Sequence, residues 1–233
     1  MNDEQTLICL IRDYPLITVE QLCQLALSKK NGKPRPMQSV ARSLKKLCEE
    51  KRPYINRNEK RQTPNTPHIY AITKYAAQEK DIGGYPIDLS ERKDKGIKHE
   101  VLINDIHIAL REQVIYWVQD RKTLWRHGVQ PDAFFKVKLG EAKRSYFLEA
   151  ETGTNNNFDV LEKYRGYERL RLLMKKETLD WLPMVKFSVL TILPTKESAQ
   201  ALEQEVYKEK IIDPTYKAFY MFSTLPIAEP LIK

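Results

Sequence analysis

The sequence predicts an α+β protein built from two domains with a mixed central sheet in the second. Apolar residues at helical spacing alternate with short apolar runs that are typical of strands. A segment with two glycines, a proline and a charge run, DIGGYPIDLSERKDKG, interrupts these patterns. The 233 residues are enough for two modest cores. We therefore expect a first domain over residues 1–80, a linker over 81–97 and a second domain over 98–233.

The composition is that of an ordinary globular protein, with 42% apolar and 30% charged residues. No apolar run is long enough to cross a membrane, and the acidic start MNDEQ does not match a secretory signal. The three cysteines form no CxxC pair, which favours free, buried thiols over a zinc site or a disulfide frame. We expect a cytoplasmic protein without a membrane partner.

The first domain reads as three helices followed by a hairpin. Helices are expected over 4–13, over 18–27, where Thr18 and Gln21 form a capping-box pattern, and over 37–50. Two short strands, 54–57 and 68–72, flank a long polar turn, and residues 74–80 form a short closing helix.

Positive charge is concentrated in this domain. Residues 29–61 contain twelve Lys and Arg and three Glu, a local net charge of +9, whereas the whole chain carries +8. The stretch coincides with the third helix and the hairpin, which points to a polyanionic partner. A solvated charged face remains the alternative.

Three helices and a basic hairpin resemble the winged helix-turn-helix DNA-binding domains of bacterial regulators and initiators. The resemblance implies that the third helix enters the major groove of duplex DNA and that the hairpin reaches the backbone or minor groove. A protein-docking module is the alternative. The candidate DNA-contacting residues are Gln38, Ser39, Arg42, Ser43, Lys46, Arg57, Lys60 and Arg61.

The second domain is expected to follow the order α-β-β-β-α-β-α. The periodicity predicts a long helix over 98–120 and later helices over 157–176 and 196–210. Strands are expected over 123–127, 131–139, 145–152 and 184–193, with a turn at 140–144. This is not the regular alternation of a Rossmann unit.

Three carboxylates stand out in this domain. Glu149 and Glu151 share one side of the third strand, and Asp132 lies near the start of the second, so we expect them to approach one another opposite the apolar face. Such a group suits Mg²⁺ or Mn²⁺. Lys163, on the next helix, is placed to stabilise the charge of a phosphate. The alternative is an ordinary charged edge on a surface hairpin.

The segments Pro131-Asp132 and Glu149-Ala150-Glu151 resemble the PD-(D/E)XK nuclease fold of restriction endonucleases. Glu stands at position 151 where that motif has lysine, and Lys163 is the candidate replacement. The resemblance implies catalytic roles for Asp132, Glu149 and Lys163. It also implies a metal site made of Asp132, Glu149, Glu151 and, from the first helix of the domain, Glu100.

Nearly the full chain also resembles the replication-relaxation proteins of plasmids and integrated mobile elements. The matching segments are KHEVLINDIHIAL, PDAFF, FLEAETGT and LEKYRGY. The resemblance implies a DNA-associated role in replication or maintenance of such an element. Two alternatives stay open: a Mg²⁺-dependent DNA nuclease or nickase, and a winged-helix transcriptional regulator whose nuclease-like domain is inactive. In the last case the second domain would be a scaffold or would form a homodimer.

Overall fold

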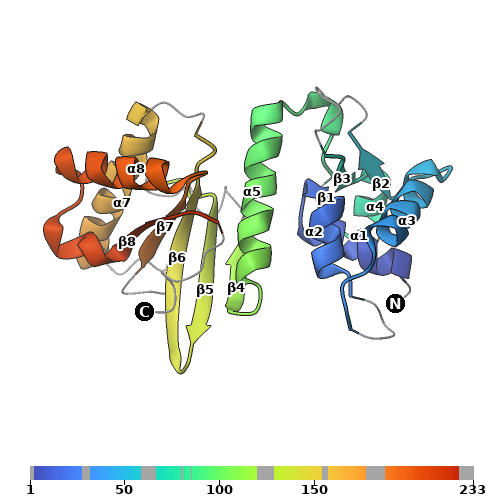
Figure 1. Cartoon of the computed structure of the whole chain (residues 1–233), viewed down its shortest axis with the longest axis horizontal. Coiled ribbons are helices and arrows are strands. Elements are labelled where there is room, and N and C mark those ends of the chain that lie inside the picture. Colours follow the sequence, from blue (N-terminus) through green and yellow to red (C-terminus); the bar gives the residue numbers. More distant parts are fainter. Residues whose placement is uncertain are drawn as a thin grey trace. The chain divides into compact units, whose positions relative to one another are not determined.

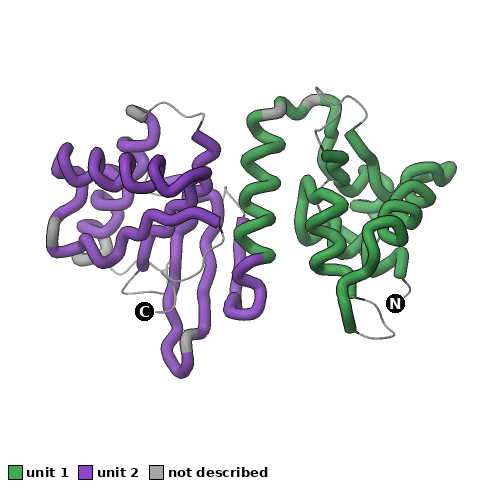
Figure 2. The backbone as a smooth tube through the Cα atoms, in the orientation of Figure 1, with its two compact units in different colours: residues 1–108 green, residues 109–233 purple. Residues whose placement is uncertain are grey.

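The computed structural model divides the chain into two compact units, residues 1–108 and 109–233 (Figures 1 and 2). It describes residues 3–27, 32–58, 67–79, 81–84, 86–119, 129–153, 157–176 and 187–225. Lys60, Arg61 and the strand expected over 123–127 lie outside these residues. The division falls near the end of a helix rather than in the segment 81–97, so this helix belongs almost entirely to the first unit.

The first unit contains the three predicted helices and the hairpin. Its elements are α1 (Asp3–Asp13), β1 (Ile17–Thr18), α2 (Val19–Leu25), α3 (Met37–Glu49), β2 (Ile55–Arg57), β3 (Ile69–Ile72), α4 (Lys74–Gln78), the 3-10 helix η1 (Leu89–Glu91) and α5 (Asp94–Leu110). The capping box at the start of α2 is confirmed, with Thr18 and Gln21 bonding each other's backbone N–H.

A small antiparallel sheet closes the helical core of this unit. Its strand order is β1-β3-β2, with Ile17 opposite Tyr70 and Ile55 opposite Ile72. The two-residue strand β1 is not predicted by the sequence, because two residues are too few to show an alternating pattern. Its pairing with β3 ties the α1–α2 connection to the hairpin.

The prediction of one helix over residues 98–120 is wrong at its C-terminal end. Helix α5 ends at Leu110, and Val114–Val118 forms strand β4, which pairs antiparallel with β5. The segment VIYWV is rich in β-branched and aromatic residues, which favour a strand. Gln113 makes the turn, because its N–H donates to Leu110 O and its C=O accepts from Lys138 N.

The second unit is built on a five-stranded mixed sheet of order β4-β5-β6-β7-β8 (Figure 1). Strands β4, β5 and β6 are antiparallel, and β6, β7 and β8 are parallel. Besides β4, the elements are β5 (Ala133–Leu139), β6 (Ala142–Ala150), α7 (Asn157–Lys176), β7 (Ser188–Ile192), α8 (Lys196–Lys208), the 3-10 helix η3 (Pro214–Phe219) and β8 (Tyr220–Ser223).

The core of the second unit joins α7 and α8 to the sheet. Phe134 of β5, Phe147 of β6 and Val189 of β7 belong to one buried cluster with apolar residues of both helices. Strand β6 is buried on both sides from Tyr146 to Ala150, so the face that carries Glu149 is covered as well. Among the described residues, no helix is long and apolar enough to cross a membrane.

Candidate functional site

The three predicted carboxylates are buried in the second unit. Asp132, Glu149 and Glu151 are only 7%, 1% and 3% exposed, which excludes the interpretation as a solvated charged edge. Backbone bonds fix their positions: Asp132 N donates to Leu148 O, and Glu151 N donates to Ile192 O. The ends of β5, β6 and β7 therefore meet at this cluster.

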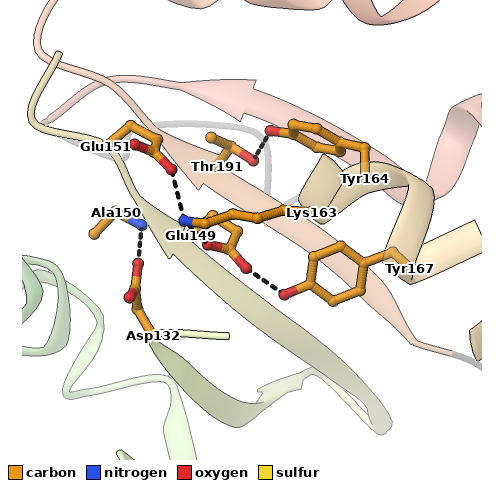
Figure 3. Close-up of polar contacts among 8 residues, drawn as sticks. All are labelled: Asp132, Glu149, Ala150, Glu151, Lys163, Tyr164, Tyr167 and Thr191. Atoms are coloured by element: carbon orange, nitrogen blue, oxygen red, sulfur yellow. Dashed lines mark hydrogen bonds and ion pairs between the residues drawn. The ribbon is translucent and has the colours of Figure 1, made fainter. Parts of the chain in front are cut away.

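Lys163 is the cation of the cluster (Figure 3). It lies on α7, and its Nζ is 2.7 Å from Glu149 Oε2 and 2.8 Å from Glu151 Oε1. One ammonium group thus bridges two glutamates, and the role of Lys163 in stabilising a phosphate stays a prediction. Asp132 is held differently, because its Oδ2 accepts a hydrogen bond of 2.8 Å from Ala150 N.

Two tyrosines of α7 extend the network. Tyr167 donates to Glu149 Oε1, and the Tyr164 hydroxyl lies 2.6 Å from Thr191 Oγ1 (Figure 3). Both tyrosines are fully buried. Spacing alone does not reveal their hydroxyl partners, because these depend on how α7 packs over β6 and β7.

Burial and charge act on the pKa values of this cluster in opposite directions. Burial raises the pKa of Glu149 to about 7, Lys163 opposes the rise and Asp132 adds to it. Burial alone would lower the pKa of Lys163, but Glu149, Asp132 and Glu151 outweigh it and hold this pKa above its usual value. The position of Glu149 in the core, rather than its charged partner, therefore dominates its protonation.

The fit of a divalent metal depends on Lys163. Among the residues that the structure describes, no group of three or more His, Cys, Asp or Glu side chains is arranged to hold a metal ion. Both oxygens of Glu149 and one oxygen of Glu151 bond protein donors, and Lys163 supplies two of these bonds. A metal ion would therefore have to displace Lys163. Glu100, predicted as a further ligand, lies on α5 in the first unit.

A second candidate surface is the outer side of α3. Val40, Leu44 and Leu47 are buried, and the opposite stripe carries Gln38, Arg42 and Lys45, all exposed. These three recur at spacings of four and three, so they lie on one face of the helix. Lys45 is absent from the predicted set, although its spacing from Gln38 and Arg42 was sufficient to find it.

The other predicted α3 residues have partners inside the first unit. One guanidinium nitrogen of Arg35 bonds Ser39 Oγ at 3.1 Å and Ser43 Oγ at 3.4 Å. Lys46 Nζ lies 2.6 Å from Glu4 Oε1 of α1. Arg57 is exposed at the end of β2. The structure therefore separates an outward stripe on α3 from residues that position the helix.

Comparison with known protein families identifies the family of the chain. A family model described as replication-relaxation matches residues 9–179, which span all of β1 to β6, all of α7 and the C-terminal part of α1. No curated protein and no solved structure matches the chain.

Proposed function

Because the chain belongs to the replication-relaxation family, we propose that it is a DNA-binding protein acting in the replication or maintenance of a plasmid or integrated mobile element. The family assignment supports the replication theme. Binding to duplex DNA is the mechanism that the first unit supports best, for reasons of element order and charge.

The observation that carries this proposal is the outward stripe of α3. The order α1-β1-α2-α3-β2-β3, with β2 and β3 as an antiparallel pair, is the order expected of a winged helix-turn-helix. In that arrangement the third helix enters the major groove, and here it presents Arg42 and Lys45 to solvent. Their cationic groups suit phosphate oxygens, and the exposed Arg57 suits the flanking backbone.

Replacement of Arg42 and Lys45 by Ala tests this proposal. The double variant should bind duplex DNA at least tenfold more weakly, because two phosphate contacts are lost. The slope of log K against log salt should fall by about 0.9 for each contact removed. The matched control is Lys196→Ala with Lys208→Ala, which removes the same charge from the exposed side of α8. Equal losses in both double variants would show that only net charge matters and would reject α3 as the contact surface.

A metal-dependent DNA nuclease or nickase is the second candidate function. It is supported by the cluster of Asp132, Glu149 and Lys163 on strands and a helix of order β-β-β-α-β, the order expected for the sheet of a restriction-endonuclease-like domain. A bound Mg²⁺ or Mn²⁺ would polarise the phosphodiester and lower the pKa of water. Asp132, Glu149 and Glu151 are the residues that would hold it, and the displaced Lys163 ammonium could then face the phosphate.

Incubation with supercoiled plasmid and either metal ion tests the nuclease. The informative variant is Asp132→Asn, because an amide oxygen can still accept the hydrogen bond from Ala150 N while the negative charge is lost. Nicking by the wild type that disappears in Asp132→Asn supports the nuclease. A plasmid that is bound but left intact with both metals rules it out and leaves the DNA-binding function in place.

A further inference from the structure

The first turn of α3 carries an exposed apolar side chain and an exposed amide, ahead of the basic residues Arg42, Lys45 and Lys46. Met37 is 52% exposed, and Gln38 next to it is exposed as well. The first turn contains no acidic residue, so nothing on it repels the phosphates of DNA. Burial of the Met37 side chain against a partner would favour binding.

Several of the remaining α3 residues are bonded to other parts of the first unit, which leaves fewer α3 residues able to contact DNA bases. Ser39 and Ser43 bond Arg35, and Lys46 pairs with Glu4. Arg42 and Lys45 lie farther along the outward stripe, where a recognition helix rises toward the phosphates, and Lys45 also lies 3.8 Å from Glu49 of the same helix. This leaves Met37 and Gln38 at the N-terminal end, which is the end that such a helix directs toward base edges.

The chemistry of these two side chains matches the two bases of one pair. The Gln38 amide has a donor and an acceptor, which complement N7 and the N6 amino group of adenine. The Met37 side chain ends in an apolar methyl thioether, which packs well against the C5 methyl group of thymine. No other base pair offers this combination in the major groove.

We propose that Met37 and Gln38 are specificity-determining residues that read an A·T base pair in the major groove of duplex DNA. The inference rests on the proposed DNA-binding function and adds the class of base pair recognised. Arg42 and Lys45 then supply affinity that is independent of sequence, and Arg35 and Glu4 hold the flanks of α3 in place.

The test begins with selection of binding sites from a pool of random-sequence duplexes. Wild type should enrich at least one A·T position that Met37→Ala with Gln38→Ala fails to enrich. At that position, uracil in place of thymine should weaken wild-type binding about fourfold, the value of one buried methyl group, and should leave Met37→Ala unaffected. Replacing adenine by 7-deazaadenine, which lacks N7, should weaken wild-type binding about fivefold or more and leave Gln38→Ala unaffected.

Leu27→Ala is the matched control, because Leu27 is exposed to a similar extent, 51%, and lies outside α3. It should discriminate thymine from uracil as the wild type does. If wild type binds duplexes but enriches no A·T position, or binds the modified and unmodified sites equally, the inference is overturned while the proposed function stands. If wild type binds no duplex at all, both are overturned.

Discussion

At the scale of single residues, Lys163 supplies the positive charge that partly offsets the negative charge of the buried carboxylate cluster. It is the cation that bonds both Glu149 and Glu151, and its side chain is itself two thirds buried. Replacement by Met would keep most of the apolar volume but leave buried carboxylates without their cation. We expect Lys163→Met to lower the free energy of unfolding of the second unit by about 3 kcal/mol at pH 8, measured by urea denaturation.

The Arg165–Glu162 pair provides the comparison for this experiment. It lies on the same helix at 2.6 Å, but both side chains are more than one third exposed. Glu162→Gln should therefore cost less than about 1 kcal/mol. Similar costs for Lys163→Met and Glu162→Gln would contradict the view that burial gives the cluster its energetic weight.

His107 gives the first unit a pH dependence. Burial lowers the pKa of His107 to about 4, with the charge of Asp13 acting in the other direction, and the ring packs on Tyr14 at 4.8 Å. Because the unfolded chain takes up this proton near pH 6.5, stability is fully present above that value and is lost as the pH falls toward 4. The loss should be on the order of 1–3 kcal/mol at pH 4.5 or below.

The measurement is the free energy of unfolding of wild type and His107→Gln at pH 7.5 and pH 4.5. The variant lacks the titrating group, so on acidification the wild type should lose more free energy of unfolding than the variant does. If the difference in free energy of unfolding between wild type and variant stays constant between the two pH values, the fold does not hold the imidazole neutral.

At the scale of elements, the sequence predicts helices better than strand ends. Helices α1, α3 and α7 match their expected ranges closely, because each shows a clear period or a clear start signal. Strand β4 was missed because VIYWV continues an apolar pattern that also suits a helix. Strand β8 was missed because YMFS is short and lacks an alternating pattern.

In the candidate site too, features with a clear local pattern are predictable from the sequence, and features that depend on tertiary packing are not. Glu149 and Lys163 were predicted because strand alternation and the following helix place them near each other. The bond from Ala150 N to Asp132 depends on the register between β5 and β6, which no local pattern specifies. The pairing of Lys46 with Glu4 joins residues far apart in the chain, so the predicted α3 surface included a residue with an internal partner.

The capping box of α2 leads to a testable prediction about the stability of this helix. Gln21 bonds Thr18 N, and its amide nitrogen also donates to Val101 O at 2.9 Å and to Asp105 Oδ1 at 2.7 Å. Gln21→Ala should destabilise α2 by about 2–3 kcal/mol, because it removes three hydrogen bonds, one of them to the buried N–H of Thr18. Ser198 holds the equivalent position in the exposed capping box of α8, and Ser198→Ala should cost only about 1 kcal/mol.

Hydrogen exchange can follow the two helices separately in the same chain. Amides of α2 should lose more protection in Gln21→Ala than amides of α8 lose in Ser198→Ala, because only Gln21 also joins its helix to α5. Equal losses would mean that the bonds from Gln21 to α5 add nothing beyond the cap itself.

At the scale of the whole molecule, α5 completes the first unit rather than opening the second. Asn104 donates to Pro15 O, and Ile97 and Val101 join a cluster with Leu16 and Ile69. Because α5 contributes these buried contacts, the unit requires residues beyond the expected boundary at 80. The proposed DNA-binding surface on α3 and the support from α5 therefore belong to one folding unit.

Two fragments test this division. A fragment of residues 1–112 should unfold cooperatively and should keep the salt dependence of DNA binding shown by the full chain, because it contains α3 and all of α5. A fragment of residues 1–93 exposes Leu16, Ile69 and Ala71 and removes two partners of Gln21. Its urea midpoint should be clearly lower, since several buried apolar side chains lose their cover. Equal midpoints for the two fragments would place the end of the first unit before α5 and restore the boundary that the sequence suggests.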